Sequence, residues 1–242
     1  MKIIIPSRGR GAVSAKTQKM FPSSIISVAE SELQEYSKYS DTVETRPDEV
    51  RGMGNIRQWI LDHYEGTVVM VDDDISYLGC FTDITYRRIA GGDNYVRILE
   101  NCEQMAEDLG INLFGFNQSC DVRKYQYYRP FLFTSYAGGV MGIRNRDIKF
   151  DRNLMVRAED VDFALQNLIK YRMILIDNRY GFVANRLSMT GGNTEYRTDE
   201  RDLYEMDYLK KKWGQYIQFS TGKGTRHTSI NVKRNFYNVK GL

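Results

Sequence analysis

Short apolar runs alternate along this chain with segments in which apolar residues recur at helical spacing. Strand-like runs cover residues 2–5, 25–28 and 67–71, and Ile56 and Ile60 mark the helical segment that precedes the third run. The third run contains no charged residue, as expected of a strand that is buried on both faces of a sheet. This alternation restricts the chain to an α/β fold with an open sheet and helices on both faces.

The alternation continues toward the C-terminus. Helices are expected near 31–39, 98–109, 158–171 and 199–213, and strands near 42–45, 112–116 and 173–176. Two further strand-like segments, 129–135 and 137–143, follow each other with no helix between them. Because parallel neighbours need a crossover and antiparallel neighbours do not, we expect a mixed but mostly parallel sheet.

The net charge of +3 is distributed unevenly along the 242 residues. Segment 215–242 holds five bases and no acid, with aromatic residues between them, so the rest of the chain is slightly acidic. We therefore expect one domain over 1–214 and a basic, aromatic C-terminal extension over 215–242. Cations beside stacking rings are typical of nucleic-acid grooves, although a solvated tail has the same composition. Together with the similar stretch 123–129, this segment supplies the nucleic-acid candidates Arg123, Lys124, Lys223, Arg226, Lys233 and Arg234.

Other features of the composition exclude whole classes of protein. No apolar run approaches the roughly 18 residues that cross a bilayer, and the N-terminus begins as a strand and not as a signal peptide. Three scattered Cys form neither a disulfide framework nor a metal motif, which favours a reducing compartment. We expect a cytoplasmic protein without a membrane partner.

Three consecutive carboxylates, Asp72, Asp73 and Asp74, follow the third apolar run directly. They are expected at the carboxyl edge of the sheet, where open α/β folds bind ligands. Side chains alternate along an extended chain, so Asp72 and Asp74 would point one way and Asp73 the other. Converging carboxylates favour a cation such as Mg²⁺ or Mn²⁺, which usually also holds phosphate oxygens. The alternative is a cap for a following helix, which needs only one Asp.

Several motifs together resemble the GT-A fold glycosyltransferases, with a Rossmann-like sheet that binds a nucleotide sugar. In chain order they are Ile3–Arg10, the Gly-x-x-x-x-Arg element Gly52–Arg57, the Asp-x-Asp element Asp72–Asp74, the glycine-rich Ala137–Ile143 and the Glu-Asp pair in Ala158–Asp162. The resemblance spans about residues 1–195. Within this superfamily the chain is most similar to the viral TET-associated glycosyltransferases, which are thought to act on hydroxymethylated pyrimidines in DNA.

The resemblance implies a role for each motif. Asp72 and Asp74 would bind Mn²⁺ or Mg²⁺, and Asp160, with Glu159 second, would be the catalytic base of an inverting transfer. The donor, most simply a UDP-sugar, would contact Pro6, Ser7, Arg8, Arg10, Glu30, Arg57 and Asp73. The acceptor would contact Gly138, Gly139, Thr190, Gly191 and Gly192. Asp162 better fits a structural acid in the first turn of a helix.

One departure and two alternatives remain open at the level of sequence. Many GT-A enzymes supply a third metal ligand, a His, near the end of the core, but segment 187–192 contains none. The acceptor could instead be a saccharide, a lipid or a protein. A nucleic-acid-binding protein with a structural acid cluster is the alternative outside enzymes. Neither Gly9–Ser14 nor Gly52–Arg57 completes Gly-x-Gly-x-x-Gly, so a dinucleotide-dependent oxidoreductase is not expected.

Overall fold

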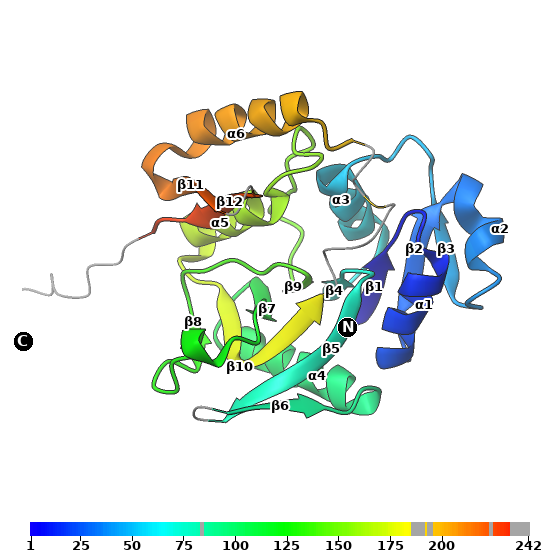
Figure 1. The fold of residues 1–242 in the computed structure, drawn as a ribbon, viewed down its shortest axis with the longest axis horizontal. Coiled ribbons are helices and arrows are strands. Elements are labelled where there is room, and N and C mark those ends of the chain that lie inside the picture. The colour runs from blue at the N-terminus through cyan, green and yellow to red at the C-terminus, as the bar shows by residue number, and fades with distance from the viewer. Residues whose placement is uncertain (83–84, 185–191, 193–195, 223–224, 233–242) are drawn as a thin grey trace, which may run out of the picture.

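A mixed sheet forms the centre of the molecule, in a computed structural model that describes residues 1–82, 85–184, 192, 196–222 and 225–232 (Figure 1). Within these residues, ten strands form the sheet in the order β3-β2-β1-β4-β9-β7-β10-β5-β6, with β8 beside β10. The fold class expected from the alternation of strands and helices is confirmed.

The N-terminal half of the sheet is parallel. It consists of β1 (Lys2–Pro6), β2 (Ile25–Ala29), β3 (Val43–Arg46) and β4 (Val68–Val71), connected by α1 (Gly11–Met20), the short α2 (Leu33–Tyr36) and α3 (Met53–His63). Because these strands are parallel, β1 and β4 end at the same edge of the sheet. The turn after Pro6 and the acids after Val71 are therefore neighbours.

The second half of the sheet is mixed. Its strands are β5 (Ile75–Thr82), β6 (Thr85–Ile89), β7 (Leu113–Asn117), β8 (Phe131–Leu132), β9 (Val140–Ile143) and β10 (Leu175–Ala184). Strand β9 runs antiparallel to both β4 and β7, and so joins the two halves. The glycine-rich segment before β9 is thereby placed beside the acids after β4.

Helices cover both faces of the sheet. Along β4, Val68 and Met70 pack with α3 and with α5 (Glu159–Tyr171), whereas Val69 and Val71 pack on the other face with α4 (Asp93–Asp108). All four side chains are almost fully buried. The uninterrupted apolar run is thus explained by burial on two faces.

The C-terminal region adds a helix and a hairpin to one side of this core. Helix α6 (Asp199–Trp213) lies next to the hairpin of β11 (Ile217–Gly222) and β12 (Thr225–Ile230), and β12 contacts α5 (Figure 1). Ile217 is buried in the core on the α5 side. The boundary at 214 stays a prediction, and a cut there would remove a packed hairpin.

Sequence periodicity missed several elements, among them α1, β5, β6 and the C-terminal hairpin. The chain after Asp74 enters strand β5, so the helix that one of these acids could have capped is absent there. Helix α4 begins after Gly92 with no side-chain cap. In the part of the chain that the structure describes, no helix combines the length and the apolar character of a bilayer span.

Candidate active site

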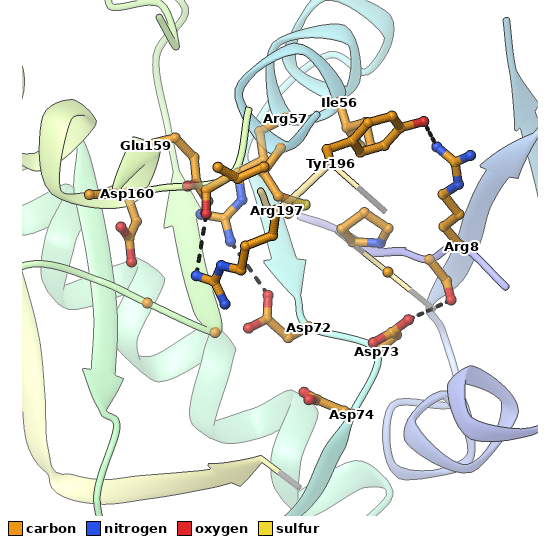
Figure 2. A pocket seen from close by; sticks show the side chains of 18 of the residues that line it. Arg8, Ile56, Arg57, Asp72, Asp73, Asp74, Glu159, Asp160, Tyr196 and Arg197 are labelled. Atoms are coloured by element: carbon orange, nitrogen blue, oxygen red, sulfur yellow. Dashed lines mark hydrogen bonds and ion pairs between the residues drawn. The ribbon is translucent and has the colours of Figure 1, made fainter. Parts of the chain in front are cut away.

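A cavity of about 420 Å³ opens at the edge where β1 and β4 end (Figure 2). Segments that are far apart in the sequence converge on it: the turn after β1, the start of α3, the acids after β4, the glycines before β9 and the start of α5. The predicted residues that line it are Pro6, Ser7, Arg8, Arg10, Arg57, Asp72, Asp73, Asp74, Gly138, Gly139, Glu159, Asp160 and Gly192.

Asp73 is fastened to the N-terminal part of the chain. Its carboxylate accepts hydrogen bonds from Ser7 Oγ at 2.6 Å and from Arg10 Nη1 at 3.1 Å, and its carbonyl accepts one from Thr17 Oγ1 at 2.7 Å. Burial raises the pKa of Asp73, and the bonds from Ser7 and Arg10 oppose that effect. These contacts hold the strand end against the β1 turn.

Asp72 turns the opposite way, toward Arg57 (Figure 2). Its backbone N–H donates to the carbonyl of Gly139 at 2.7 Å, and a Cβ on Gly139 would lie 2.7 Å from the Asp72 carboxylate. A Cβ on Gly138 would lie 2.2 Å from the Gln118 side chain. Glycine at 139 therefore lets the segment before β9 approach Asp72 closely, and glycine at 138 leaves room for Gln118.

Arg57 connects the acids of β4 with those of α5. Its Nη2 lies 3.4 Å from Asp72 Oδ1 and its Nη1 lies 3.5 Å from Glu159 Oε1, and the side chain is almost fully buried. The pKa of Glu159 is raised to about 7, chiefly by burial. The charge of Arg57 opposes this rise, and the charge of the neighbouring Asp160 adds to it. Asp160 follows as the second residue of α5 and is less buried than Glu159.

Two acidic walls thus face each other across the cavity. We call the acids Asp72–Asp74 with the turn after β1 the strand wall, and Glu159 and Asp160 with the loop 151–158 the helix wall. Figure 2 shows Glu159 and Asp160 on the opposite side of the cavity from Asp73 and Arg8.

The strand wall suits a hard cation. Asp72 and Asp74 offer carboxylate oxygens, and Mg²⁺ commonly takes one or two carboxylates and completes its shell with water and substrate phosphate. Among the described residues, no group of three or more acidic, His or Cys side chains forms a metal cluster. The two His also lie away from the cavity. The donor set therefore fits Mg²⁺ or Mn²⁺ only together with a phosphate-bearing ligand.

Three basic or aromatic residues that line the cavity were not predicted from the sequence. Tyr196 accepts a hydrogen bond from Arg8, whose guanidinium also lies over its ring at 4.8 Å. Arg197 extends into the cavity between Asp160 and Asp72 (Figure 2). Arg46 is buried under the β1 turn, donates to the carbonyls of Ser27 and Ser7, and has its pKa lowered by burial to about 10. None of the three belongs to a recognisable motif, so only the fold identifies them.

Other predicted residues lie elsewhere. Glu30 is exposed at the start of a short 3-10 helix and does not line the cavity. Arg123 is exposed and pairs with Asp121 at 2.8 Å. Lys124 belongs to a 3-10 helix and Arg226 to β12. Thr190, Gly191, Lys223, Lys233 and Arg234 lie outside the described residues.

Asp162 has the structural role expected of it. It is fully buried in the first turns of α5, where Trp213 Nε1 donates to one carboxylate oxygen at 2.7 Å. Gln166 Nε2 donates to the other oxygen at 2.8 Å, and Lys212 Nζ lies 2.7 Å away. The acid does not line the cavity.

Similarity to known proteins agrees with this geometry. The sequence matches the TET-associated glycosyltransferase family over residues 1–192. No curated protein matches the chain. Family membership therefore rests on the match to most of the sequence.

Two solved structures with TM-scores above 0.5 support the fold. The mannosyltransferase PcManGT from Pyrobaculum calidifontis, in complex with GDP-Man and Mn²⁺, is 13% identical with a TM-score of 0.52, over 77% of this chain and 57% of that one. Glucosyl-3-phosphoglycerate synthase from Mycobacterium tuberculosis, in complex with Mg²⁺ and UDP, is 13% identical with a TM-score of 0.52, over 95% and 86%. S. aureus TarS 1-349 is 15% identical with a TM-score of 0.49, over 76% and 60%.

The chain spans less than two thirds of the length of the TarS and PcManGT structures. At these identities the likeness concerns the fold alone, and that fold is the GT-A fold expected from the ordered motifs. The match over 1–192 adds the family itself, which confirms the resemblance drawn from the sequence. The chain belongs to the TET-associated glycosyltransferase family.

Proposed function

We propose that this glycosyltransferase moves a sugar from a nucleoside diphosphate sugar to a hydroxyl group, with a divalent cation held by Asp72 and Asp74. The observation that carries the proposal is the pairing of the strand wall and the helix wall across one cavity of about 420 Å³. This volume lies within the range of small-molecule sites. One wall suits a cation and a diphosphate, and the other offers a base for the hydroxyl.

The side chains divide the work between them. Arg8, Arg10 and Arg197 line the cavity and would bind the phosphate oxygens through charge-assisted hydrogen bonds. The bound cation would stabilise the negative charge that develops on the departing diphosphate. Because Arg10 is already paired with Asp73, the donor would meet an arginine whose position is set before binding.

Asp160 is the better placed of the two acids for proton transfer. Glu159 is buried and pairs with Arg57, whereas Asp160 is partly exposed at the cavity. In the proposed step the acceptor oxygen bonds to the anomeric carbon, the bond from that carbon to the diphosphate breaks, and the hydroxyl proton passes to Asp160. A single displacement of this kind inverts the anomeric centre. The N-terminus of α5 favours the ionised carboxylate that accepts the proton.

We further propose that the acceptor is a hydroxymethylated pyrimidine in DNA. The family name points that way, and one surface feature supports it. The segment between Gln118 and Tyr136 begins and ends at the cavity, and on it Tyr127 and Tyr128 are 69% and 67% exposed. Exposed rings near cations can stack on bases beside a neutralised backbone.

Mass analysis of nucleosides tests this proposal directly. The protein is incubated with hydroxymethylpyrimidine DNA, Mn²⁺ or Mg²⁺ and a panel of nucleotide sugars. We expect one donor class to add the mass of one sugar to the modified nucleoside, and excess chelator to abolish the product. Absence of product with every donor would reject the DNA acceptor, and full turnover in chelator would reject the cation.

DNA binding tests the acceptor surface separately. Replacing Tyr127 and Tyr128 by Ala should weaken binding to hydroxymethylpyrimidine DNA about ten-fold, since a stacked base contributes about 1–3 kcal/mol. Donor hydrolysis should not change. Tyr204→Ala, which removes another exposed ring, from α6, is the control. Equal DNA affinity of the double variant and the control would contradict this surface.

The role of the C-terminal bases in DNA binding is better tested by charge substitution than by truncation. Removal of everything after Gly214 would also remove Ile217 from the core. Lys233→Gln with Arg234→Gln leaves the described hairpin intact, and a DNA contact there predicts a flatter salt dependence of binding. An unchanged salt dependence would argue against these two bases.

A further inference from the structure

The loop before α5 is held by a buried carboxylate of α6. Glu205 is fully buried, and its two oxygens accept hydrogen bonds from three consecutive backbone N–H groups. The distances are 2.9 Å from Met155, 3.1 Å from Val156 and 2.8 Å from Arg157. Arg201, one turn earlier in α6, pairs with Glu205 at 2.7 Å and balances its charge. A non-helical segment thereby has its amide groups satisfied at a single point.

A second α6 acid holds the side chain of the same loop. Asp202 lies three residues before Glu205 and forms a two-pronged pair with Arg157, with Nε–Oδ1 at 2.5 Å and Nη2–Oδ2 at 2.7 Å. Arg157 also donates to Thr228 Oγ1 of β12 at 3.1 Å. Both partners of the pair are buried, so the geometry of the fork determines where the loop lies.

The clamped loop leads directly into α5 and the two acids at its start, Glu159 and Asp160. Ala158 follows Arg157 with a left-handed φ of 51°, and Glu159 and Asp160 come next. A non-glycine residue in this region is disfavoured and persists only where its surroundings impose it. Val156 and Ala158 themselves line the cavity. A shift of the loop would therefore move both acids.

The same loop also holds the start of α3. The backbone N–H groups of Met53 and Gly54 donate to the carbonyls of Met155 and Leu154 at 2.9 and 3.0 Å. These bonds set the start of α3, the helix that carries Arg57. Loop 151–158 thus stands between α6 and Arg57, which contacts both walls.

Stability alone does not explain such a clamp. A buried ion pair often contributes no more to the free energy of unfolding than well-packed apolar residues of the same volume. These contacts do fix the geometry of the loop, because the carboxylate oxygens of Glu205 and Asp202 have defined partners in residues 155–157. Helix α6 also lies beyond residues 1–192, which match the family, so the family motifs do not include this support.

We propose that Glu205 and Asp202 are positioning residues, which hold loop 151–158 so that Glu159 and Asp160 face the cavity in the reactive arrangement. This proposal rests on the transfer reaction proposed above. It assigns α6 to the catalytic machinery, although no α6 side chain lines the cavity.

Glu205→Gln tests the clamp, because Gln replaces one carboxylate oxygen by an NH₂ group that cannot accept from backbone N–H. We expect kcat to fall about a hundred-fold, the loss attributed to an active-site displacement of about 1 Å. The KM for the donor should stay within about two-fold, since the strand wall binds the donor. Hydrogen exchange should quicken at the amides of 155–157 and in the first turn of α5.

Two control variants separate positioning from simple loss of stability. Leu209→Ala removes a buried apolar side chain of α6 outside the clamp, and Glu200→Gln makes the same charge change on its exposed side. At a temperature where all variants are folded, both should keep kcat within about three-fold, even if Leu209→Ala melts earlier.

The outcomes distinguish this proposal from the proposed function. A wild-type kcat for Glu205→Gln, or an equal fall for Leu209→Ala at the same folded fraction, would overturn the positioning role. A wild-type protein that neither transfers sugar nor hydrolyses any donor would instead overturn the proposed reaction. In that case, unchanged exchange at 155–157 in Glu205→Gln would overturn the clamp as well.

Discussion

The strand wall and the helix wall are both acidic, but different parts of the chain hold them. In the strand wall, Asp73 accepts hydrogen bonds from Ser7 and Arg10, which flank α1 or the turn after β1, and from Thr17 of α1. The helix wall depends on Glu205 and its neighbours, which follow it by more than 40 residues. The proposed donor site, built from the N-terminal half, thus faces a proposed base whose position we attribute to the C-terminal helix.

Loss of a strand-wall acid should have the largest effect. Asp72→Asn or Asp74→Asn should lower sugar transfer about 10³-fold, because each would remove a negative ligand from the proposed cation, which would stabilise the leaving diphosphate. Mn²⁺ binding, measured by electron paramagnetic resonance with a nucleoside diphosphate present, should weaken in parallel. Asp41→Asn, at an exposed position, is the control. Full activity of both cavity variants would remove the distinction between the walls.

Loss of the base should come next. Asp160→Asn should lower kcat about 10²-fold with little change in donor KM, as expected for a group that takes part in proton transfer. Glu159→Gln should lower kcat about ten-fold, because it removes the charge that pairs with Arg57 but leaves Asp160, the proposed base, in place. If Glu159→Gln proves the more damaging variant, the two roles are exchanged.

The pH dependence of kcat sharpens this assignment. Burial raises the pKa of Glu159 to about 7, so Glu159 gains a proton and its attraction to Arg57 weakens as the pH falls through 7. The wild-type rate should therefore rise with pH across this range. Glu159→Gln should flatten that limb, and Asp160→Asn should keep it. A limb that persists in Glu159→Gln would assign the titration to another group.

Substitution of Arg57, which contacts both walls, should reduce kcat less than loss of Asp72, Asp74 or Asp160. Lysine has one compact charge and lacks the fork that reaches Asp72 and Glu159 together. Arg57→Lys should lower kcat about ten-fold and raise the Mn²⁺ concentration needed for half-maximal rate. Arg51→Lys, just before α3 and exposed, is the control. If Arg57→Lys retains the wild-type cation requirement and rate, the walls act independently.

The strand wall is the part of the site that sequence predicts well. Asp72–Asp74 adjoin an apolar run, which predicts their place at the end of a buried strand. Because parallel strands end at the same edge of a sheet, the β1 turn is then expected beside them. The helix wall is predicted only as a Glu-Asp pair. Its supports, Asp202 and Glu205, look like ordinary acids on a charged helix, and no spacing in the sequence connects them with residues 155–157. Tyr196, Arg197 and Arg46 escaped for the same reason.

Most of the elements that sequence periodicity missed share a physical cause. Helix α1 buries Gly11, Ser14, Ala15 and Thr17, so its inner face is built of small and polar residues and shows no apolar stripe. Edge strand β6 carries Arg87 and Arg88, and the hairpin strands are rich in Ser and Thr. Periodicity detects elements that bury a row of large apolar side chains, which α1, β6 and the hairpin do not. Strand β5 is the exception, because it buries Ile75, Leu78 and Phe81.

Thr17 offers the smallest effect and the clearest contrast between the walls. Its buried hydroxyl donates to the carbonyl of Asp73 at 2.7 Å and lies 3.2 Å from that of Ile75. Thr17→Val should lower the free energy of unfolding by about 1–2 kcal/mol, since it leaves a buried carbonyl without its partner. Turnover should stay within about two-fold, because Ser7 and Arg10 still hold Asp73. Denaturant unfolding and steady-state rates measure both quantities, with exposed Thr85→Val as the control. A large fall in kcat would mean that the strand wall, like the helix wall, depends on each of its supports; a small one would mean that only the helix wall does.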